Sequence, residues 1–396
     1  MIDQTQYYRD TWAEIDLEAL RQNVKSIRDG LPRETKMFAA VKANAYGHGI
    51  VQIAKEALQA GAHGLVVALL DEALVLRQSG VQAPILVLGL IRSADAGVAA
   101  RHDISVPAFQ MDWLKEAMEA IDPADPPLKL HIKCDTGMGR IGLKSEAELK
   151  DIEQFIYRHH DFFELEGIFT HFSTADQMSE VYYQRQLALF KTFVSSLQQT
   201  PPYVHAANSA GALCHTDSLF NAVRVGIAIY GLSVSQERPP SVKRKQVFSL
   251  HTKIVHVKKI NPGESISYGA GYKAKDEEWI ATIPVGYADG WLRKLEGQRV
   301  IAGGRRAYIV GRICMDQTMI KLPEYMPVGT KVTLIGGQGQ GDFIPVEEIA
   351  GKLETINYEV TCTINFRVPR IYKNGCQTSE VENKLLAGAP SVDKKD

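Results

Sequence analysis

The sequence is poor in cysteine, and its five cysteines do not form a recognisable set. Their number is odd, they are widely spaced, and neither a Cys-x-x-Cys pair nor a Cys/His ligand spacing occurs. A disulfide framework and a structural zinc site are therefore not indicated, and we expect no metal centre. The natural expectation is a reducing compartment, the cytoplasm.

Long apolar runs and an excess of charge of one sign are also missing. No stretch approaches the roughly 18 consecutive apolar residues that a membrane span requires, and the first ten residues lack the basic and apolar regions of a secretory signal. Lys and Arg number 45 and Asp and Glu 46, which leaves a formal net charge of −1. This balance gives no electrostatic reason to expect nucleic acid or a membrane as a partner.

The chain does have eight apolar, strand-like runs that alternate with helical segments between residues 17 and 245. Runs that are apolar throughout favour a parallel sheet buried on both faces. Eight such runs joined by helices predict a (β/α)8 barrel, although the runs alone do not exclude an open doubly wound sheet. The runs cover residues 37–41, 64–69, 84–89, 104–109, 128–134, 167–172, 203–208 and 223–231.

The pattern becomes β-rich after residue 245, where strand-like segments are separated by Gly, Pro and Asn turns. We therefore expect a barrel over residues 17–245, a mostly β C-terminal domain over 246–376 and a disordered polar tail over 377–396. Residues 1–16 form an N-terminal strand segment that joins the sheet of one domain or the other. The glycine-rich segment "GGQGQGD" (336–342) lacks a following Rossmann helix and indicates a hairpin turn.

Barrel enzymes carry their active sites at the C-terminal ends of the strands. Lys42 follows the first apolar run directly, where a buried strand seldom ends in an amine. Other polar side chains lie near the ends of this run and of later runs, and all would meet at one end of the barrel. They include Asn44, Tyr46, His48, Lys133, Asp135, Arg140, His171, Asp176, His205, Asn208, Ser209 and Arg224.

An anion site is expected after the seventh and eighth runs, because barrels often hold phosphate there through backbone N–H groups and a helix N-terminus. Ser209 and the backbone around Gly226 could provide such a site. A partly desolvated lysine has a lowered pKa and attacks aldehydes. A lysine, a phosphate site and no metal motif together suggest a cofactor held as a Schiff base.

Nine motifs spread over the chain carry a family resemblance. They are "AVKANAYGHG", "DTGMGRIG", "THFSTAD", "HAANSAG", "AVRVGIAIYGL", "ISYGAGY", "PVGYADG", "ICMDQTMIKL" and "INYEV". With them the sequence resembles the alanine racemase family, which are pyridoxal 5'-phosphate (PLP) enzymes of fold type III. The resemblance runs from "TWAEIDL" to about "RVPRIY", nearly the whole chain.

The resemblance implies a role for each matching residue. Lys42 would hold PLP through a Schiff base, and Tyr268, reaching in from a partner subunit, would be the second acid/base. Arg224 would face the pyridine nitrogen, and His171 and His205 would link it to Tyr268. Arg140 and Met315 would bind substrate. Lys133 would carry a carbamate that orients Arg140, unless it simply pairs with Asp135. Tyr46, Asn208, Ser209, Gly226, Ile227 and Tyr358 would complete the cofactor site, with Tyr287 and Asp316 near the entrance.

The implied reaction is the interconversion of L-alanine and D-alanine, which supplies D-alanine for peptidoglycan. Racemisation removes a proton from one face of Cα and returns one to the other, so it needs two bases, here Lys42 and Tyr268 in a homodimer with shared sites. Guanidinium only donates hydrogen bonds, so Arg224 would keep the pyridine nitrogen unprotonated. A broad-specificity racemase is the nearest alternative. Less favoured are a fold-type-III decarboxylase, whose "EPGR" segment is missing, and a non-enzymatic PLP-binding protein.

Overall fold

The computed structural model describes residues 7–235, 237, 244–337 and 341–386, and they divide into two compact units. One unit comprises residues 20–45 and 49–244. The other comprises the N-terminal 19 residues, residues 46–48 and everything from Lys245. Within the described ranges, no helix is long and apolar enough to cross a membrane.

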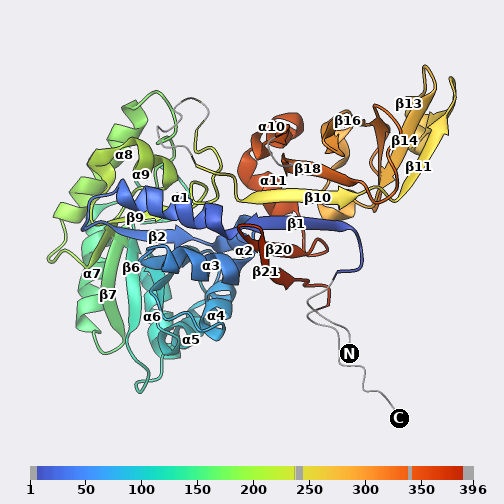
Figure 1. Ribbon diagram of the computed structural model, residues 1–396. Coiled ribbons are helices and arrows are strands. Elements are labelled where there is room, and N and C mark those ends of the chain that lie inside the picture. Colours follow the sequence, from blue (N-terminus) through green and yellow to red (C-terminus); the bar gives the residue numbers. More distant parts are fainter. Residues whose placement is uncertain (1–6, 236, 238–243, 338–340, 387–396) are drawn as a thin grey trace, which may run out of the picture. The chain divides into compact units, whose positions relative to one another are not determined.

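The first unit contains a closed barrel of parallel strands, which confirms the predicted fold class (Figure 1). The barrel closes where the first strand pairs with the last, with Phe38 opposite Arg224. Its strands are largely buried along their whole length, as expected when helices cover the outside and side chains fill the inside. They are β2 (Lys36–Ala40), β3 (Gly64–Val67), β4 (Ile85–Val87), β5 (Ile104–Ala108), β6 (Leu128–Lys133), β7 (Phe163–Phe169), β8 (Tyr203–His205) and β9 (Ala222–Val225).

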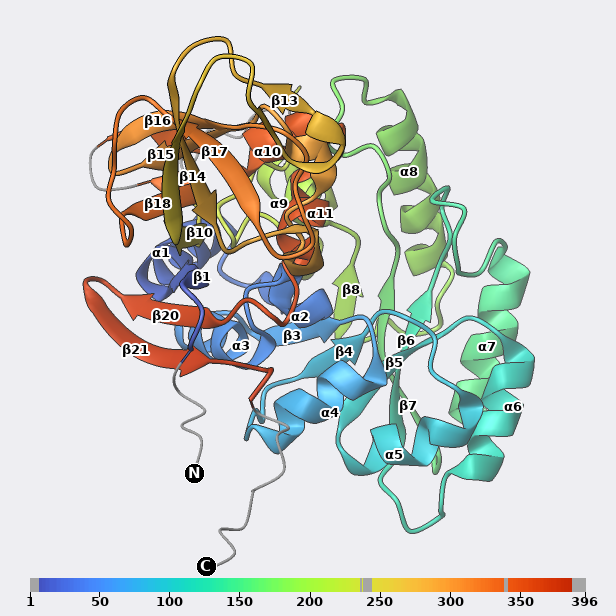
Figure 2. The same cartoon turned by 90° about the vertical axis from the view of Figure 1, so that its right-hand side faces the viewer.

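Helices alternate with the barrel strands along the chain and flank them on the outside (Figure 2). The helix that starts after Ser145 shows how the sequence fixes such a boundary. The Ser145 hydroxyl accepts a hydrogen bond from the Glu148 N–H, and the Glu148 carboxylate accepts one from the Ser145 N–H, which is a capping box. The helices are α1 (Leu17–Asp29), α2 (Lys42–Tyr46), α3 (Ile50–Gln59), α4 (Leu70–Gln78), α5 (Ala96–Arg101), α6 (Met111–Ala120), α7 (Glu146–Arg158), α8 (Val181–Ser195) and α9 (Ser209–Cys214).

The second unit is mostly β and is built on one large sheet. In the described residues the strand order is β11-β14-β17-β16-β15-β18-β10-β1-β20-β21, and β19 pairs with β18. The strands are β1 (Thr11–Asp16), β10 (Phe248–Lys253), β11 (His256–Ile260), β14 (Glu278–Ile283), β15 (Arg299–Ala302), β16 (Arg305–Ile309), β17 (Thr318–Leu322), β18 (Lys331–Gly337), β19 (Phe343–Ile344), β20 (Arg370–Asn374) and β21 (Gln377–Glu382). A small ladder of β12 (Ser265–Ile266) and β13 (Tyr272–Lys273), with helices α10 (Val346–Leu353) and α11 (Asn357–Thr363), completes the unit.

The sheet answers which domain takes the N-terminal strand. Strand β1 pairs antiparallel with β10 and parallel with β20, so it lies inside the sheet of the C-terminal unit. Residues 377–382, which the sequence placed in a polar tail, form β21 because the turn at Gly375 folds them back onto β20. Residues 387–396 of that tail lie outside the described residues. Strands β18 and β19 pair as the predicted hairpin would require, although its residues 338–340 also lie outside them.

Candidate active site

Lys42 stands at the start of an unusual turn that follows strand β2. Ala43, Asn44 and the next two residues have φ values of 53–54°, so α2 is one turn of left-handed helix built without glycine. Such a conformation costs about 1–2 kcal/mol per residue. Two side chains help to hold it: Glu72 Oε1 accepts from the Ala43 N–H at 2.6 Å, and Asn44 Oδ1 accepts from the Ile50 N–H at 3.0 Å. The half-buried Lys42 is thus fixed by a strained backbone, which is characteristic of functional sites.

Lys133, at the end of β6, is buried with its Nζ 4.4 Å from the centre of the Phe169 ring. Burial lowers the pKa of this amine well below its ordinary value, and the positive charges of Arg224 and Arg140 add to the effect. The alternative pairing with Asp135 is not realised, because Asp135 forms its ion pair with Lys144 at 2.6 Å. Burial and the two arginines therefore favour the uncharged form of the Lys133 amine.

Arg224 of β9 is the centre of the polar groups in this barrel. Its Nη1 donates to His205 Nδ1 at 2.6 Å, and its Nη2 donates to the carbonyl of Thr170 at 2.7 Å. His171 Nδ1 lies 3.4 Å from Arg224 Nη2. The Nε of Arg224 has no hydrogen-bond partner among the described residues. Burial and the nearby Arg140 lower the pKa of Arg224 to about 9, so the group remains cationic at neutral pH. Burial and the charge of Arg224 lower the pKa of His171 well below its usual range, which keeps that imidazole neutral.

A small cradle of polar groups follows β8 and β9. The Ser209 hydroxyl accepts a hydrogen bond from the Gly226 N–H at 2.9 Å, and Ile227 beside it is buried. Asn208 caps α9 by accepting from the Gly211 N–H, and its own amide donates to the carbonyl of Phe172 at 3.3 Å. A hydroxyl and backbone N–H groups at the end of parallel strands are suited to bind an anion.

Two further predicted cofactor residues contact each other in the C-terminal unit. The Tyr46 and Tyr358 rings lie 5.8 Å apart, centre to centre, with an angle of 47° between their planes. Burial raises the pKa of Tyr46, with a contribution from Tyr358, so Tyr46 is a neutral hydrogen-bond donor. Gly47, next in the chain, has a φ of 84°, and a Cβ there would lie 2.1 Å from the carbonyl oxygen of Thr361.

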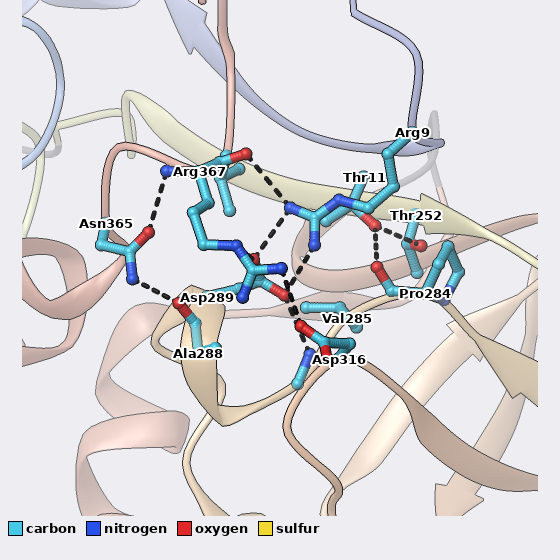
Figure 3. Close-up of polar contacts among 12 residues, drawn as sticks. Arg9, Thr11, Thr252, Pro284, Val285, Ala288, Asp289, Asp316, Asn365 and Arg367 are labelled. Carbon is cyan, nitrogen blue, oxygen red and sulfur yellow. Dashed lines mark hydrogen bonds and ion pairs between the residues drawn. The ribbon is translucent and has the colours of Figure 1, made fainter. Parts of the chain in front are cut away.

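The loop around Ala288 and Asp289 and the loop that carries Asp316 are held together in the same unit by polar contacts (Figure 3). The N–H groups of Tyr287 and Ala288 donate to the carbonyls of Cys314 and Met315 at 3.1 and 3.0 Å. Arg367 Nη2 donates to Asp316 Oδ1 at 2.7 Å, and its Nε lies 3.7 Å from Asp289 Oδ1.

The fully buried Asp289 anchors this arrangement. Its Oδ2 accepts from Arg9 Nη1 at 2.9 Å and from the Gly286 N–H at 3.0 Å, while Arg9 Nη2 lies 2.8 Å from Oδ1. Sequence reasoning did not single out Arg9, Asp289 or Arg367, because no local motif marks an ion pair between residues 280 positions apart.

Tyr268 begins a single turn that follows strand β12, and its side chain is 69% exposed. Ser267 before it has a φ of 70°, and the Ser267 hydroxyl donates to the carbonyl of Arg312 at 2.7 Å. The phenol is thus presented outward from a backbone that is held in place. Met315 is also more than half exposed, and Tyr287 is 39% exposed.

The barrel interior holds polar residues that the sequence analysis missed. His131 of β6 and Glu166 of β7 are buried and bonded to each other, with His131 Nε2 2.9 Å from Glu166 Oε2. The segment "LKLHIKC" was interpreted as apolar throughout, but Lys129, His131 and Lys133 alternate along it. This period of two is the signal that could have revealed them, because alternate residues of a strand share a face.

Comparison with known proteins identifies the family. Residues 15–234 match the model of the alanine racemase N-terminal domain, and residues 247–372 match that of the alanine racemase C-terminal domain. The chain is 53% identical to an alanine racemase of Geobacillus kaustophilus over 385 residues, which cover 97% of this chain and all of the relative.

Two solved structures are similar over nearly the whole chain. A crystal structure of alanine racemase from Bacillus anthracis with bound L-Ala-P has a TM-score of 0.92 and 48% identity, covering 96% of this chain and 99% of the other. A histidine racemase from Leuconostoc mesenteroides has a TM-score of 0.88 and 30% identity, covering 94% of this chain and all of the other. The chain therefore belongs to the alanine racemase family and is an isomerase.

Proposed function

We propose that this enzyme interconverts L-alanine and D-alanine with PLP held by Lys42. The support is a lysine, a cationic arginine and a hydroxyl–amide cradle, all at the C-terminal ends of strands of one closed barrel. These residues fit the cofactor: Lys42 would hold its aldehyde, Ser209 and the backbone N–H groups at Gly226 and Ile227 would hold its phosphate, and Arg224 would face its pyridine nitrogen. When bound, PLP withdraws electrons from the substrate and so acidifies the Cα proton.

Lys42 and Tyr268 then act as the two bases. The Lys42 Nζ takes or returns a proton on one face of Cα, and the Tyr268 hydroxyl does so on the other. Because tyrosine ionises near pH ~10 in water, such a base needs cationic neighbours. Arg224 and Arg140 are the cations we assign to this task. Arg224 cannot give up its proton at neutral pH, and the pyridine nitrogen that it faces therefore stays unprotonated.

Arg140 binds the substrate carboxylate in this proposal, with the Met315 N–H as a further donor. The lowered pKa of Lys133 supports the predicted carbamate, because only an unprotonated amine adds carbon dioxide. A carbamate is an anion, and it would compensate the two guanidinium groups that lower the pKa of Lys133. It would also accept hydrogen bonds from Arg140 and so fix its orientation.

We further propose that Tyr268 serves the site of a second copy of this chain. The support is the exposure of Tyr268 together with that of Met315 and Tyr287, since large apolar side chains gathered at a surface mark interaction sites. Tyr287, held by its backbone hydrogen bond to Cys314, and Asp316, held by Arg367 (Figure 3), would then line the entrance of the partner's site.

The biological role that we propose is the supply of D-alanine for peptidoglycan in the cytoplasm. All five cysteines are free, as a reducing compartment would require. The histidine racemase with 30% identity is a reason to consider other amino acids as substrates. Rates with a panel of L-amino acids would separate an alanine-specific from a broad-specificity racemase, and release of carbon dioxide would indicate a decarboxylase instead.

The deciding experiment combines two substitutions with labelling in deuterated water. Lys42→Ala should abolish both the visible absorption of the bound cofactor and racemisation, whereas Lys36→Ala at the exposed start of β2 should retain both. Tyr268→Phe should retain the absorption but lose most of the turnover, whereas Tyr308→Phe, another exposed tyrosine of the same unit, should not. Full rates in both directions for Tyr268→Phe would exclude the two-base assignment.

Subunit mixing tests the shared site. Mixed Lys42→Ala and Tyr268→Phe proteins should regain activity, because one of the two sites in a heterodimer then has both bases. If the mixture stays inactive although the subunits exchange, Tyr268 does not act in the partner's site.

A further inference from the structure

A continuous line of buried polar groups runs through the barrel interior from Arg224 to Glu166. Arg224 Nη1 lies 2.6 Å from His205 Nδ1, and His205 Nε2 lies 2.8 Å from His131 Nδ1. His131 Nε2 lies 2.9 Å from Glu166 Oε2, which also accepts from the Ser105 hydroxyl at 2.5 Å. All five side chains are buried, and they come from five different strands of the barrel.

The chemistry of the two ends fixes the direction of every hydrogen bond in this line. Guanidinium can only donate, so His205 Nδ1 must be an acceptor and its Nε2 must carry the proton. His131 Nδ1 then accepts from His205, and the His131 proton sits on Nε2 and points to Glu166. An ionised carboxylate can only accept, which agrees with this order.

The charges of the two ends complement each other. Arg224 has no ion-pair partner within the described parts of the chain, although it is buried and cationic. Burial would raise the pKa of Glu166, but the hydrogen-bonding and electrostatic interaction with His131, the hydrogen bond from Ser105 and the charge of Lys129 outweigh it, so the pKa lies below its ordinary value. Burial and Arg224 lower the pKa of His205 well below its usual range. In the hydrogen-bond order given above, the line thus joins the Arg224 cation to the Glu166 anion through two rings that each carry one proton.

Packing prevents the two rings from turning out of line. The His205 ring stacks on Phe169 at 4.9 Å, and the His131 ring stacks on Tyr203 at 5.9 Å. Gly167 lies so close to His131 that an added Cβ would come within 2.3 Å of its Nδ1. Because the ring positions are fixed, only the nitrogen that carries the proton can change in each histidine, and the charges of Arg224 and Glu166 determine which nitrogen it is.

We propose that Glu166 is a positioning residue for the reaction: through His131 and His205 it holds the hydrogen-bond acceptor that keeps the Arg224 guanidinium in place. Without the carboxylate, His205 can move its proton to Nδ1, where it would oppose an N–H of Arg224 at 2.6 Å. Arg224 would then be displaced from the position that faces the cofactor's pyridine nitrogen. The expected effect on catalysis rests on the proposed function, whereas the predicted tautomers of His131 and His205 are independent of it.

The tautomers can be measured without any activity. Nitrogen-15 NMR of the histidine rings, in the full chain with and without PLP, should show His131 and His205 protonated at Nε2 alone at neutral pH. Assignment uses the spectra of His131→Phe and His205→Phe. A proton on Nδ1 of either ring, or two protons on one ring, would overturn the proposal.

Kinetics of the holoenzyme then test the role of the charge. Glu166→Gln keeps an acceptor but removes the anion, and its matched control is Glu153→Gln, a fully buried glutamate on α7 with no link to Arg224. For charges on the order of 10 Å apart at an effective dielectric of about 20, we expect kcat to fall about tenfold. The KM for alanine should change little, and the visible absorption band of the bound cofactor should shift. The control should show neither effect.

Two further variants, Glu166→Asp and His131→Phe, complete the test. Glu166→Asp should lose less activity than Glu166→Gln, because it keeps the charge, and the reverse order would point to packing and refute the proposal. His131→Phe should match Glu166→Gln, and the double variant should lose no more than either alone, since both break one line. Additive losses would show that the two residues act separately. If the proposed function itself were wrong, the unmodified protein would neither absorb visible light nor racemise alanine, whereas the tautomer measurement would still stand.

Discussion

The ion pair between Arg9 and Asp289 offers a quantitative test of how the C-terminal unit is stabilised. Asp289 is fully buried, and Arg9 contacts both of its carboxylate oxygens, at 2.9 and 2.8 Å. Breaking a buried pair by removing one partner typically costs about 3–5 kcal/mol, because the remaining charge stays desolvated. Arg9 is partly exposed, and Arg367 still lies 3.7 Å from the carboxylate. We therefore expect Arg9→Met to lower the free energy of unfolding by about 3 kcal/mol, the lower end of that range.

The ion pair of Asp10, which follows Arg9 in the chain, provides a matched control. Lys253 pairs with Asp10 at 2.8 Å, but both side chains are exposed to solvent, and such pairs contribute about 0–1 kcal/mol. Urea unfolding followed by circular dichroism, at one fixed protein and cofactor concentration, should therefore show a large loss for Arg9→Met and a small one for Lys253→Met. If the two variants lose the same amount, or if Arg9→Met loses less than about 1 kcal/mol, burial of Asp289 does not govern this network.

Three further outcomes are expected. Gly47→Ala should prevent stable folding, because its Cβ would meet the Thr361 carbonyl at 2.1 Å, whereas Gly80→Ala, with a φ of 88° and open space, should cost about 1 kcal/mol in a thermal melt. Burial lowers the pKa of His251 to about 4. As the pH falls from about 6.5 to 4, the unfolded chain therefore binds more protons at this residue than the folded one, and the free energy of unfolding decreases. In urea titrations, His251→Gln should remove up to about 3 kcal/mol of that decrease. Carbon-13 bicarbonate should give the holoenzyme a carbamate resonance in NMR spectra, which Lys133→Arg should lack and Lys129→Arg should retain. If the unmodified holoenzyme and Lys129→Arg both lack this resonance, the carbamate is excluded.

The barrel could be predicted because its strands are buried on both faces, which leaves apolar runs that are easy to recognise. Strand β7 shows the limit of this signal. It begins at Phe163, four residues before the predicted run, because Glu164 and Glu166 interrupt the apolar pattern. Glu166 points to buried hydrogen-bond partners, and only the three-dimensional arrangement supplies them. The same holds for the partners of β1, whose alternating pattern fits either sheet equally well.

A candidate site residue can be predicted from the sequence where a polar side chain stands directly after an apolar run. Lys42 and Ser209 directly follow the predicted apolar runs 37–41 and 203–208, and family motifs add Arg224 and Tyr268. The supporting contacts were not predictable in this way, since Glu72 is 29 positions from the backbone N–H that it binds. Hydrogen bonds of this kind depend on loop paths that leave no periodic trace in the sequence.

The position of β1 has a consequence for how the protein is made on the ribosome. The first strand to be synthesised pairs with β10 and β20, whose residues 248–253 and 370–374 emerge much later. The barrel can close once its last strand, β9, has left the exit tunnel, but the amino-terminal strand must wait until nearly the whole chain is available. Its unpaired edges are then open to contact with other nascent chains. We expect polypeptides truncated before residue 370 to aggregate through that strand even when their barrel is intact.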